Sequence, residues 1–305
     1  MGKSKLSILI LLVALGFSIG PVSAVDIYVP STSTNQDIQD ILDINATDGD
    51  NIIFNSGATH TGIHLNCSKA LNFIGNGATL VGTGSNHVLT ITGSSGITIR
   101  GLTFNVNGYK NGITGSEVFN AKIENNTIKN GGDGINIFRY YRNLTINNNT
   151  ITNMSTSYGD GISLVNHNAT SNETTTSTTV SNNVIDDVVY GIFLGGNFKG
   201  NVTSNTITDA GTAGMNITGK KQPYQGCLIA DITSNTITSS NIGISMENPD
   251  VIYINLSNND VTSTADSLLK GIYFRMDPNS YTKIMNSNTY NNAWDDLEEN
   301  GAYWP

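Results

Sequence analysis

The chain has 305 residues and a formal charge of −9, and only 13% of its residues are charged. So few Lys and Arg residues in an acidic chain argue against nucleic-acid binding, because phosphates need a basic surface. The composition is compatible with neutral glycans, with cations or with solubility alone.

Residues 1–24 have the pattern of a secretory signal peptide. Lys3 and Lys5 precede an uncharged apolar run over 6–19, and small residues within 21–24 suit cleavage. An uncleaved membrane anchor is the alternative, although the run is short for a span of about 20 residues. Cleavage would bring the charge to about −11 and leave no apolar run of spanning length. We therefore expect a secreted, surface-associated protein without a membrane span.

Residues 25–50 predict a short strand followed by a capping helix over 35–44. Ile38, Ile41 and Leu42 recur at helical spacing after a cluster of Ser and Thr that can cap the helix. A stack of coils has an open hydrophobic end, and a short amphipathic helix can cover it.

From residue 51 a repeat dominates the chain. The triplet Asn-Thr-Ile returns after 22 to 24 residues at the shortest, and Gly followed by an apolar residue recurs between the copies. The triplet and its looser copies begin at Asn126, Asn149, Asn183, Asn205, Asn235, Asn259 and Asn288, and the glycines are Gly112, Gly134, Gly161, Gly191, Gly214, Gly243 and Gly271.

In the residues after each glycine, apolar side chains alternate with side chains that should point outward. Ile135 and Ile137 flank Asn136, for example, and this alternation predicts a strand whose flanks face an interior. Each coil can bury so few apolar residues only by stacking on its neighbours. The sequence predicts an all-β fold, a right-handed single-stranded parallel β-helix over 51–292, with a C-terminal tail or cap over 293–305. Stacked Asn side chains are expected to hydrogen-bond along the axis, and the glycines to supply a positive φ at a corner.

Two insertions interrupt the repeat, at 166–179 and 219–226. Both follow a Gly strand, so they should form two walls on one edge, with the tight segment Gly195-Gly196 between them. Exposed rings beside amides and cations suit sugar binding, although the rings could merely cover the edge of the stack. The ligand-binding candidates are Arg139, Tyr140, Tyr141, Arg142, Phe193, Phe198, Lys199, Lys220, Lys221 and Tyr224.

Asp133 and Asp160 each precede a corner glycine on adjacent coils. They should stack about 5 Å apart, near the carboxylate spacing of a retaining glycosidase. They could instead hold Ca²⁺, or serve only as the Asp-Gly turns that the corner favours. The two are the first candidates for catalysis. Asp187 and Asp209 form a second possible pair with the same alternatives.

No other cofactor or covalent link is expected. Cys67 and Cys227 should lie about six coils, or roughly 30 Å, apart, whereas a disulfide needs Cα atoms within about 7 Å. Both are therefore predicted to be unpaired. His60 and His64 share a face only if their strand is straight, and no third zinc ligand lies near them.

Sequons for N-glycosylation are dense, and two of them, at Asn168 and Asn172, lie in a polar insertion where a glycan fits best. The others begin at Asn45, Asn66, Asn125, Asn143, Asn148, Asn153, Asn201, Asn216 and Asn255.

The alternation of Asn-Thr-Ile and Gly-Ile resembles the right-handed parallel β-helix repeat of carbohydrate-associated proteins, over about residues 50–292. The opening, from Ile38 through 48–54 to 97–104, is similar to adhesin-like surface proteins of methanogenic archaea. This resemblance implies a secreted or surface-attached protein that handles polysaccharide. The motifs of polygalacturonases, mannuronan epimerases and pectate lyases are missing; the segment 277–280 departs from the epimerase Asp-Pro-His-Asp at its last two positions.

The sequence thus favours a non-enzymatic extracellular β-helix protein that binds glycan or acts as an adhesin. The alternative is a polysaccharide lyase or glycoside hydrolase that acts in a groove on the side of the β-helix. The expected partner is a polysaccharide or cell-surface glycan.

Overall fold

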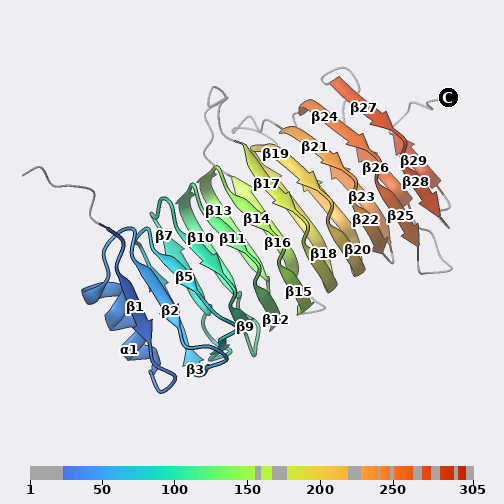
Figure 1. Ribbon diagram of the computed structural model, residues 1–305. Coiled ribbons are helices and arrows are strands. Elements are labelled where there is room, and N and C mark those ends of the chain that lie inside the picture. The colour runs from blue at the N-terminus through green and yellow to red at the C-terminus, as the bar shows by residue number, and fades with distance from the viewer. Residues whose placement is uncertain are drawn as a thin grey trace, which may run out of the picture.

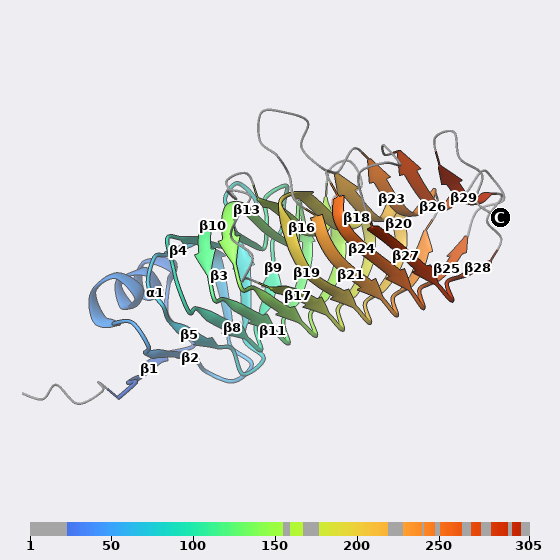
Figure 2. The same cartoon turned by 90° about the horizontal axis from the view of Figure 1, so that it is seen from above.

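The computed structural model describes residues 23–154, 159–166, 177–218, 228–239, 241–247, 251–263, 270–275, 282–291 and 295–299. They form an elongated stack of coils that runs from the helix α1 at one end to β29 at the other (Figure 1). The strands pair in parallel, each with its equivalent in the next coil, so neighbours in each face follow one another along the axis (Figure 2).

The coils have three faces. The first face is an 11-stranded sheet. Its strands are β1 (Asp26–Val29), β2 (Asn51–Phe54), β5 (Asn72–Ile74), β8 (Thr98–Arg100), β11 (Lys122–Glu124), β14 (Thr145–Asn147), β17 (Thr178–Ser181), β19 (Phe198–Thr203), β21 (Leu228–Thr233), β24 (Val251–Ser257) and β27 (Thr282–Asn286).

The second and third faces join into one sheet, because β18 (Val184–Gly196) and β20 (Thr206–Thr218) run through both. The second face also holds β3 (Thr59–Ile63), β6 (Thr79–Gly82), β9 (Thr103–Asn105), β12 (Thr127–Gly131), β15 (Thr150–Met154), β22 (Thr236–Ser239), β25 (Asp260–Ser263) and β28 (Thr289–Asn291). The third holds β4 (Leu65–Cys67), β7 (Leu89–Thr92), β10 (Ile113–Phe119), β13 (Ile135–Arg142), β16 (Asp160–Asn166), β23 (Ile242–Glu247), β26 (Lys270–Arg275) and β29 (Asp295–Glu299).

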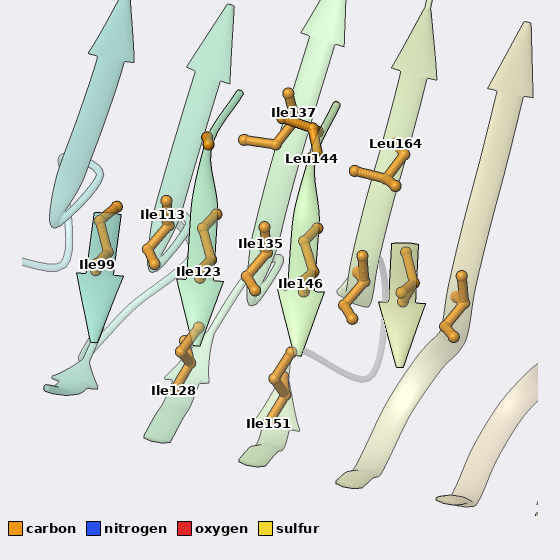
Figure 3. Close-up of a cluster of buried hydrophobic side chains, with 14 of the residues drawn as sticks. Ile99, Ile113, Ile123, Ile128, Ile135, Ile137, Leu144, Ile146, Ile151 and Leu164 are labelled. Atoms are coloured by element: carbon orange, nitrogen blue, oxygen red, sulfur yellow. The ribbon is translucent and has the colours of Figure 1, made fainter. Parts of the chain in front are cut away.

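The core is a column of aliphatic side chains between the three faces. Ile146 from the first face, Ile128 from the second and Ile135 from the third are all fully buried and stack on their equivalents in neighbouring coils (Figure 3). The alternation in the sequence is therefore confirmed as the pattern of a parallel β-helix, in which each strand points every second side chain inward.

A buried ladder of Asn side chains runs along the stack. The Nδ2 of Asn149 donates to Oδ1 of Asn183 at 3.0 Å and to the carbonyl oxygen of Ile123 at 2.8 Å. The backbone N–H of Asn149 also donates to Oδ1 of Asn183, at 3.0 Å. The predicted hydrogen bonding of stacked amides is thus confirmed, and the same pairing joins Asn126, Asn149, Asn183, Asn205, Asn235, Asn259 and Asn288 in turn.

The repeating glycines have a different role from the one expected. A Cβ on Gly134 would lie 2.5 Å from Cγ2 of Ile151 and 2.6 Å from the carbonyl oxygen of Gly161, while its φ lies outside the left-handed region. The expectation of a positive φ was wrong: close packing between coils excludes a side chain here.

The left-handed corner lies one residue before each ladder Asn. Asn125 and Asn148 have φ values of 56° and 54°. Asn tolerates this conformation better than most residues do, which explains the Asn-Asn pairs of the sequence. The same column continues through Asn182, Ser204, Ser234, Asn258 and Ser287.

The N-terminal end of the core is covered by α1 (Asn35–Asp40) and a π-helical turn, η1 (Ile41–Asn45). Thr34 caps α1 and forms a capping box with Asp37. Ile38 and Leu42 are buried in the core, so the predicted capping helix is present.

A lysine from the stack closes the other end of this helix. The Nζ of Lys69 donates to the carbonyl oxygens of Leu42, Asp43 and Ala46, at 2.7, 2.8 and 2.7 Å. Helix carbonyls at a C-terminus lack partners within the helix, and an ammonium group satisfies three of them here.

Candidate functional site

One row of outward side chains follows the middle of the third face. Its members lie in register on β10, β13, β16, β18, β20 and β23: Thr114, Asn136, Ser163, Phe193, Asn216 and Ser245. We call this set the third-face row. Thr114, Ser163 and Ser245 are only 4%, 5% and 4% exposed, so the small side chains of the row are largely enclosed by their surroundings.

A second ladder, here called the corner ladder, borders the third-face row where the second face turns into the third. The N–H of Asn111 donates to Nδ1 of His87 at 3.1 Å, and the N–H of Asp133 to Oδ1 of Asn111 at 3.2 Å. The N–H of Asp160 then donates to Oδ1 of Asp133 at 3.0 Å. In each step a side chain accepts from the backbone of the following coil.

This ladder places Asp133 and Asp160 side by side, as the repeat predicted. Burial raises the pKa of Asp133, and hydrogen bonds from Asp160 N–H and the Asn136 amide act against that rise. Burial and then the charge of Asp133 raise the pKa of Asp160 to about 7, against which a hydrogen bond with Ser163 acts. The two carboxyl groups therefore differ in environment, and Asp160 holds its proton to a higher pH than an exposed Asp does.

Two aromatic rings continue the site into the next coil. Tyr190 pairs in register with Asp160, and Phe193 pairs with Ser163. Their ring centroids lie 6.0 Å apart at an interplanar angle of 54°. Beside Phe193 in the row, Oδ1 of Asn216 is buried without a hydrogen-bond partner among the described residues. Carboxyl groups, rings and an unpaired amide oxygen thus adjoin one another on one face.

The predicted residues at the end of β13 form a separate group. Phe138, with 36% of its surface exposed, and the exposed Arg139 point outward, and Tyr140 and Arg142 are half-buried. Tyr141 is only 4% exposed and belongs to the core, which corrects its assignment to the ligand-binding set. The alternation that starts at Ile135 already places Tyr141 inward.

Phe198 and Lys199 lie on the first face, not beside Phe193. The strand β18 ends at Gly196, and β19 begins at Phe198 and pairs with β21 of the first face. Phe198 is 1% exposed as the first inward residue of β19, so its assignment as a ligand-binding residue was wrong. Lys199 points outward on β19 and is separated from the third-face row by the corner.

Several predictions fall outside the described residues. They concern Lys220, Lys221 and Tyr224 and most of both insertions, so the groove between two walls stays a prediction. Cys227, Asn168 and Asn172 lie outside as well. Cys67 is described and is an unpaired, buried cysteine, as expected.

The remaining candidates have structural surroundings. Asp187 and Asp209 have exposed side chains and a backbone in the left-handed region, with φ values of 53° and 48°. This fits the alternative that they serve only as turn residues. His60 is buried and His64 is exposed, because Gly62 between them has a φ of 71° and breaks the strand.

Neither a metal centre nor a membrane span is found in the described part of the chain. No three His, Cys, Asp or Glu side chains gather closely enough there to hold a metal ion such as Ca²⁺. Within the same ranges, no helix has the length and the apolar character needed to cross a membrane.

Sequence reasoning missed Tyr190, His87 and Asn111 as members of the site. The signal was present for Tyr190, because it precedes Gly191 as Asp133 precedes Gly134 and Asp160 precedes Gly161. His87 and Asn111 occupy the equivalent position in earlier coils, where the repeat is less regular.

The family model described as "Right handed beta helix region" matches residues 61–225, which is more than half of the chain. The chain belongs to the right-handed β-helix family. No curated protein matches the sequence of this β-helix protein.

Several solved structures are similar to this β-helix protein. The tailspike double mutant of E. coli bacteriophage HK620, in complex with a pentasaccharide, has 12% identity and a TM-score of 0.57; the match covers 90% of this chain and 67% of that one. The catalytic domain of a GH87 α-1,3-glucanase in complex with tetrasaccharides has 16% identity and a TM-score of 0.52, with 90% and 59% covered. Alginate lyase from Paenibacillus sp. str. FPU-7 has 17% identity and a TM-score of 0.48, with 87% and 99% covered.

Proposed function

We propose that this β-helix protein is a secreted surface protein that binds polysaccharide on its third face. The observation that carries the proposal is the contact of Tyr190 with Phe193 beside the polar groups of the row. A sugar ring has an apolar face and a polar edge. An aromatic ring can cover the first, while amide and carboxyl groups such as those of Asn216 and Asp160 can bind the hydroxyls of the second.

The expected leader supports a location outside the cell, and the resemblance to adhesin-like proteins supports attachment to a surface. The tailspike and the glucanase, which share the fold, are seen with oligosaccharides bound. At their low identity they support the proposal at the level of fold only.

Calorimetric titration with a panel of neutral oligosaccharides tests the binding face. Phe193→Ala and Tyr190→Ala should each weaken the binding of an oligosaccharide about tenfold, because each removes a ring that covers the sugar. Tyr28→Ala is the matched control, since Tyr28 is 62% exposed on β1 at the far end of the first face. Affinities that stay unchanged in both site variants would contradict the proposal.

A second candidate function is hydrolysis of a glycosidic bond by Asp133 and Asp160. The observation that favours it is the difference between the two carboxyl groups. With a pKa of about 7, Asp160 could hold a proton and donate it to a leaving oxygen. Asp133 accepts hydrogen bonds from the Asp160 N–H and the Asn136 amide, so it suits the role of the ionised carboxylate.

Release of reducing ends from neutral and acidic polysaccharides tests this second candidate. Asp160→Asn and Asp133→Asn should each abolish any release, while Asp209→Asn, at an exposed turn, should leave it unchanged. Activity that survives in both site variants would exclude these residues as the catalytic pair, and a wild type without activity would leave glycan binding as the function.

A further inference from the structure

A buried carboxylate, that of Asp50, lies at the N-terminal end of the stack, outside the groups proposed to bind glycan. It is 3% exposed and directly precedes β2, which pairs with β1 at the end that α1 covers (Figure 1). Both of its oxygens accept hydrogen bonds. Oδ2 accepts from the N–H and the Oγ1 of Thr47, at 2.8 and 2.9 Å, and Oδ1 accepts from the backbone nitrogen of Val25 at 2.8 Å.

These donors of Asp50 are all neutral in the chain as it is translated. Hydrogen bonds from the backbone of Thr47 and then of Val25 lower the pKa of Asp50, so the group is ionised at neutral pH. The charge of Lys69 also acts on it, but the ammonium group of Lys69 donates to three carbonyl oxygens at the end of η1. A buried carboxylate without a cationic donor gains more from one than an exposed carboxylate does.

Val25 places its backbone nitrogen against this carboxylate at the border between the expected leader and the fold. Its carbonyl oxygen accepts from the N–H of Asn51 at 2.8 Å, so the residue is fixed on both sides of its Cα. The strand β1 begins at the next residue, whereas the small residues Ser23 and Ala24 are exposed and lie outside the strand. A cut between Ala24 and Val25 would therefore remove no residue of the stack and would leave a new amino group at the nitrogen that Asp50 binds.

We propose that the chain is processed between Ala24 and Val25, and that the α-amino group formed there binds the carboxylate of Asp50 as an ion pair. A peptidase that cuts after small residues supplies the reaction, with water as the second reactant. The hydroxyl of water bonds to the carbonyl carbon of Ala24, and the C–N bond breaks. The proton of water and that of the new acid go to the nitrogen of Val25, which leaves a carboxylate on Ala24 and an ammonium group on Val25. A neutral donor thus becomes a cationic one at the same atom.

The ion pair would act on an edge of the sheet. In the 11-stranded sheet β1 is the end strand and pairs with β2 alone among the described strands. A four-residue edge strand frays readily, and Val25 before it is 54% exposed. A charge-assisted hydrogen bond at Val25 should slow this fraying and so hold the strand that places Val29 in the core. The inference shares with the proposed function only the expectation of a leader.

Two forms of the chain with defined starts test the ion pair. One begins at Val25 and the other at Ser23, and both are released from a cleavable fusion partner, so they differ only in two residues. At neutral pH we expect amide hydrogen exchange over 26–29 and 51–54 to be at least about fivefold slower in the form that begins at Val25. Exchange beyond residue 100 should be equal in the two forms.

The pKa of the α-amino group gives a second measurement that needs no substitution. A neighbouring carboxylate favours the ammonium form, so NMR titration should give Val25 a pKa well above the ordinary value of about 8 for such a group. The amino group of the form that begins at Ser23 should have the ordinary value. The other charged groups beside the pair in the chain or acting on it are Asp26, Asp48 and Lys69, and they are common to both forms.

Two variants assign the effect to one carboxylate. Asp50→Asn removes the charge and keeps the shape, so both the slower exchange and the raised pKa of the α-amino group should disappear. Asp40→Asn removes an exposed carboxylate from α1 at the same end of the stack and should keep both. If Asp50→Asn does not fold, the NMR titration of the two unsubstituted forms still decides.

Each other outcome contradicts a defined part of the inference. Equal exchange in the two unsubstituted forms, or an ordinary α-amino pKa in the form that begins at Val25, would overturn the ion pair. An advantage that survives in folded Asp50→Asn would exclude Asp50 as its cause.

The cut itself is tested by mass spectrometry of the chain that a secreting host makes from the full-length sequence. The expected product begins at Val25. A secreted chain with another start would overturn the cleavage site and leave secretion intact, whereas a chain that keeps its leader would overturn both. Glycan binding is measured separately, so its failure is distinguishable from either result.

Discussion

Asn183 lies in the middle of the buried ladder and uses both ends of its amide. Its Nδ2 donates to Oδ1 of Asn205 at 2.9 Å and to the carbonyl oxygen of Ile146 at 3.0 Å. Its Oδ1 accepts from the N–H and the Nδ2 of Asn149, both at 3.0 Å. No other side chain of similar size has a donor and an acceptor in these positions.

We predict that Asn183→Asp strongly destabilises the stack. The carboxylate would replace two donors with a buried negative charge that faces two acceptor oxygens, at a cost of about 3 kcal/mol or more. Asn182→Asp is the matched control, because Asn182 is the adjacent residue and its side chain is exposed. Its backbone has a left-handed conformation, which Asp also tolerates. Thermal and urea unfolding should show a much larger loss of stability in Asn183→Asp than in Asn182→Asp. An equal loss of stability in both variants would show that the ladder amide is dispensable.

The acidic pair predicts a pH dependence of stability. The pKa of Asp160 is raised to about 7 in the folded protein, from about 3.8 in the unfolded chain. The folded state then holds an extra proton between these values, so this group's stabilising contribution is full below about 3.8 and is lost as the pH rises through about 7.

Asp160→Asn should therefore raise the melting temperature at pH 8.5 more than at pH 4, because it removes a charge that the folded state disfavours. Asp209→Asn serves as the control, since Asp209 is exposed. Equal effects of Asp160→Asn at both pH values would show that the burial of Asp160 has no electrostatic consequence.

At the level of elements, the helix α1 depends on a residue that no helix rule would find. Lys69 lies far from α1 in the sequence, yet its ammonium group binds three carbonyl oxygens at the end of η1. Gln39 adds a second link, because its side chain exchanges hydrogen bonds with the backbone of Asn66 at 2.9 Å in both directions.

We predict that Lys69→Met loosens the N-terminal cap. The loss of three charge-assisted bonds leaves carbonyl groups without partners and should cost about 2 kcal/mol. Hydrogen exchange should speed up over residues 35–46 and stay unchanged over the coils beyond residue 100. Lys122→Met is the control for loss of an exposed lysine; protection of α1 that survives in Lys69→Met would refute this role.

The elements also show what the sequence could predict and what it could not. The β-helix, its Asn ladder and its capping helix follow from periodicity, because each coil repeats one solution to the same packing problem. The outward turn of Arg139 does not follow, since a bulge depends on the neighbouring strand, where Glu117 makes the same break. Tyr141 and Phe198 were misplaced because composition near an edge was given more weight than alternation along the strand.

At the scale of the whole molecule, each coil of the described stack pairs mainly with the coils beside it. A stack of this kind tolerates the loss of a complete coil better than the loss of part of one. Removal of residues 205–234 would join Ser204 to Asn235, so that Asn183 meets Asn235 and the ladder is restored.

We predict that the chain without residues 205–234 folds, with a parallel-sheet circular dichroism spectrum and a cooperative thermal transition. Removal of residues 205–219 alone should prevent this, because it brings the following strands onto the wrong faces. A folded product from the partial deletion, or an unfolded one from the complete deletion, would contradict the idea that the coil is the unit of stability.

The direction of the two ladders has a consequence for how the molecule is made. The buried backbone N–H of Asn126 donates to Oδ1 of Asn149 in the following coil, and its Nδ2 donates both to that oxygen and to the carbonyl oxygen of Ile99 in the preceding coil. Oδ1 of Asp133 likewise accepts from the N–H of Asp160, so in both ladders a coil is completed by the one that follows. The N-terminal end has no preceding coil to pack against, and there α1 closes the core while Lys69, from the first coils, holds the end of that helix. A chain that emerges from its N-terminus can therefore assemble in the order in which it appears, with the newest coil always the unfinished one.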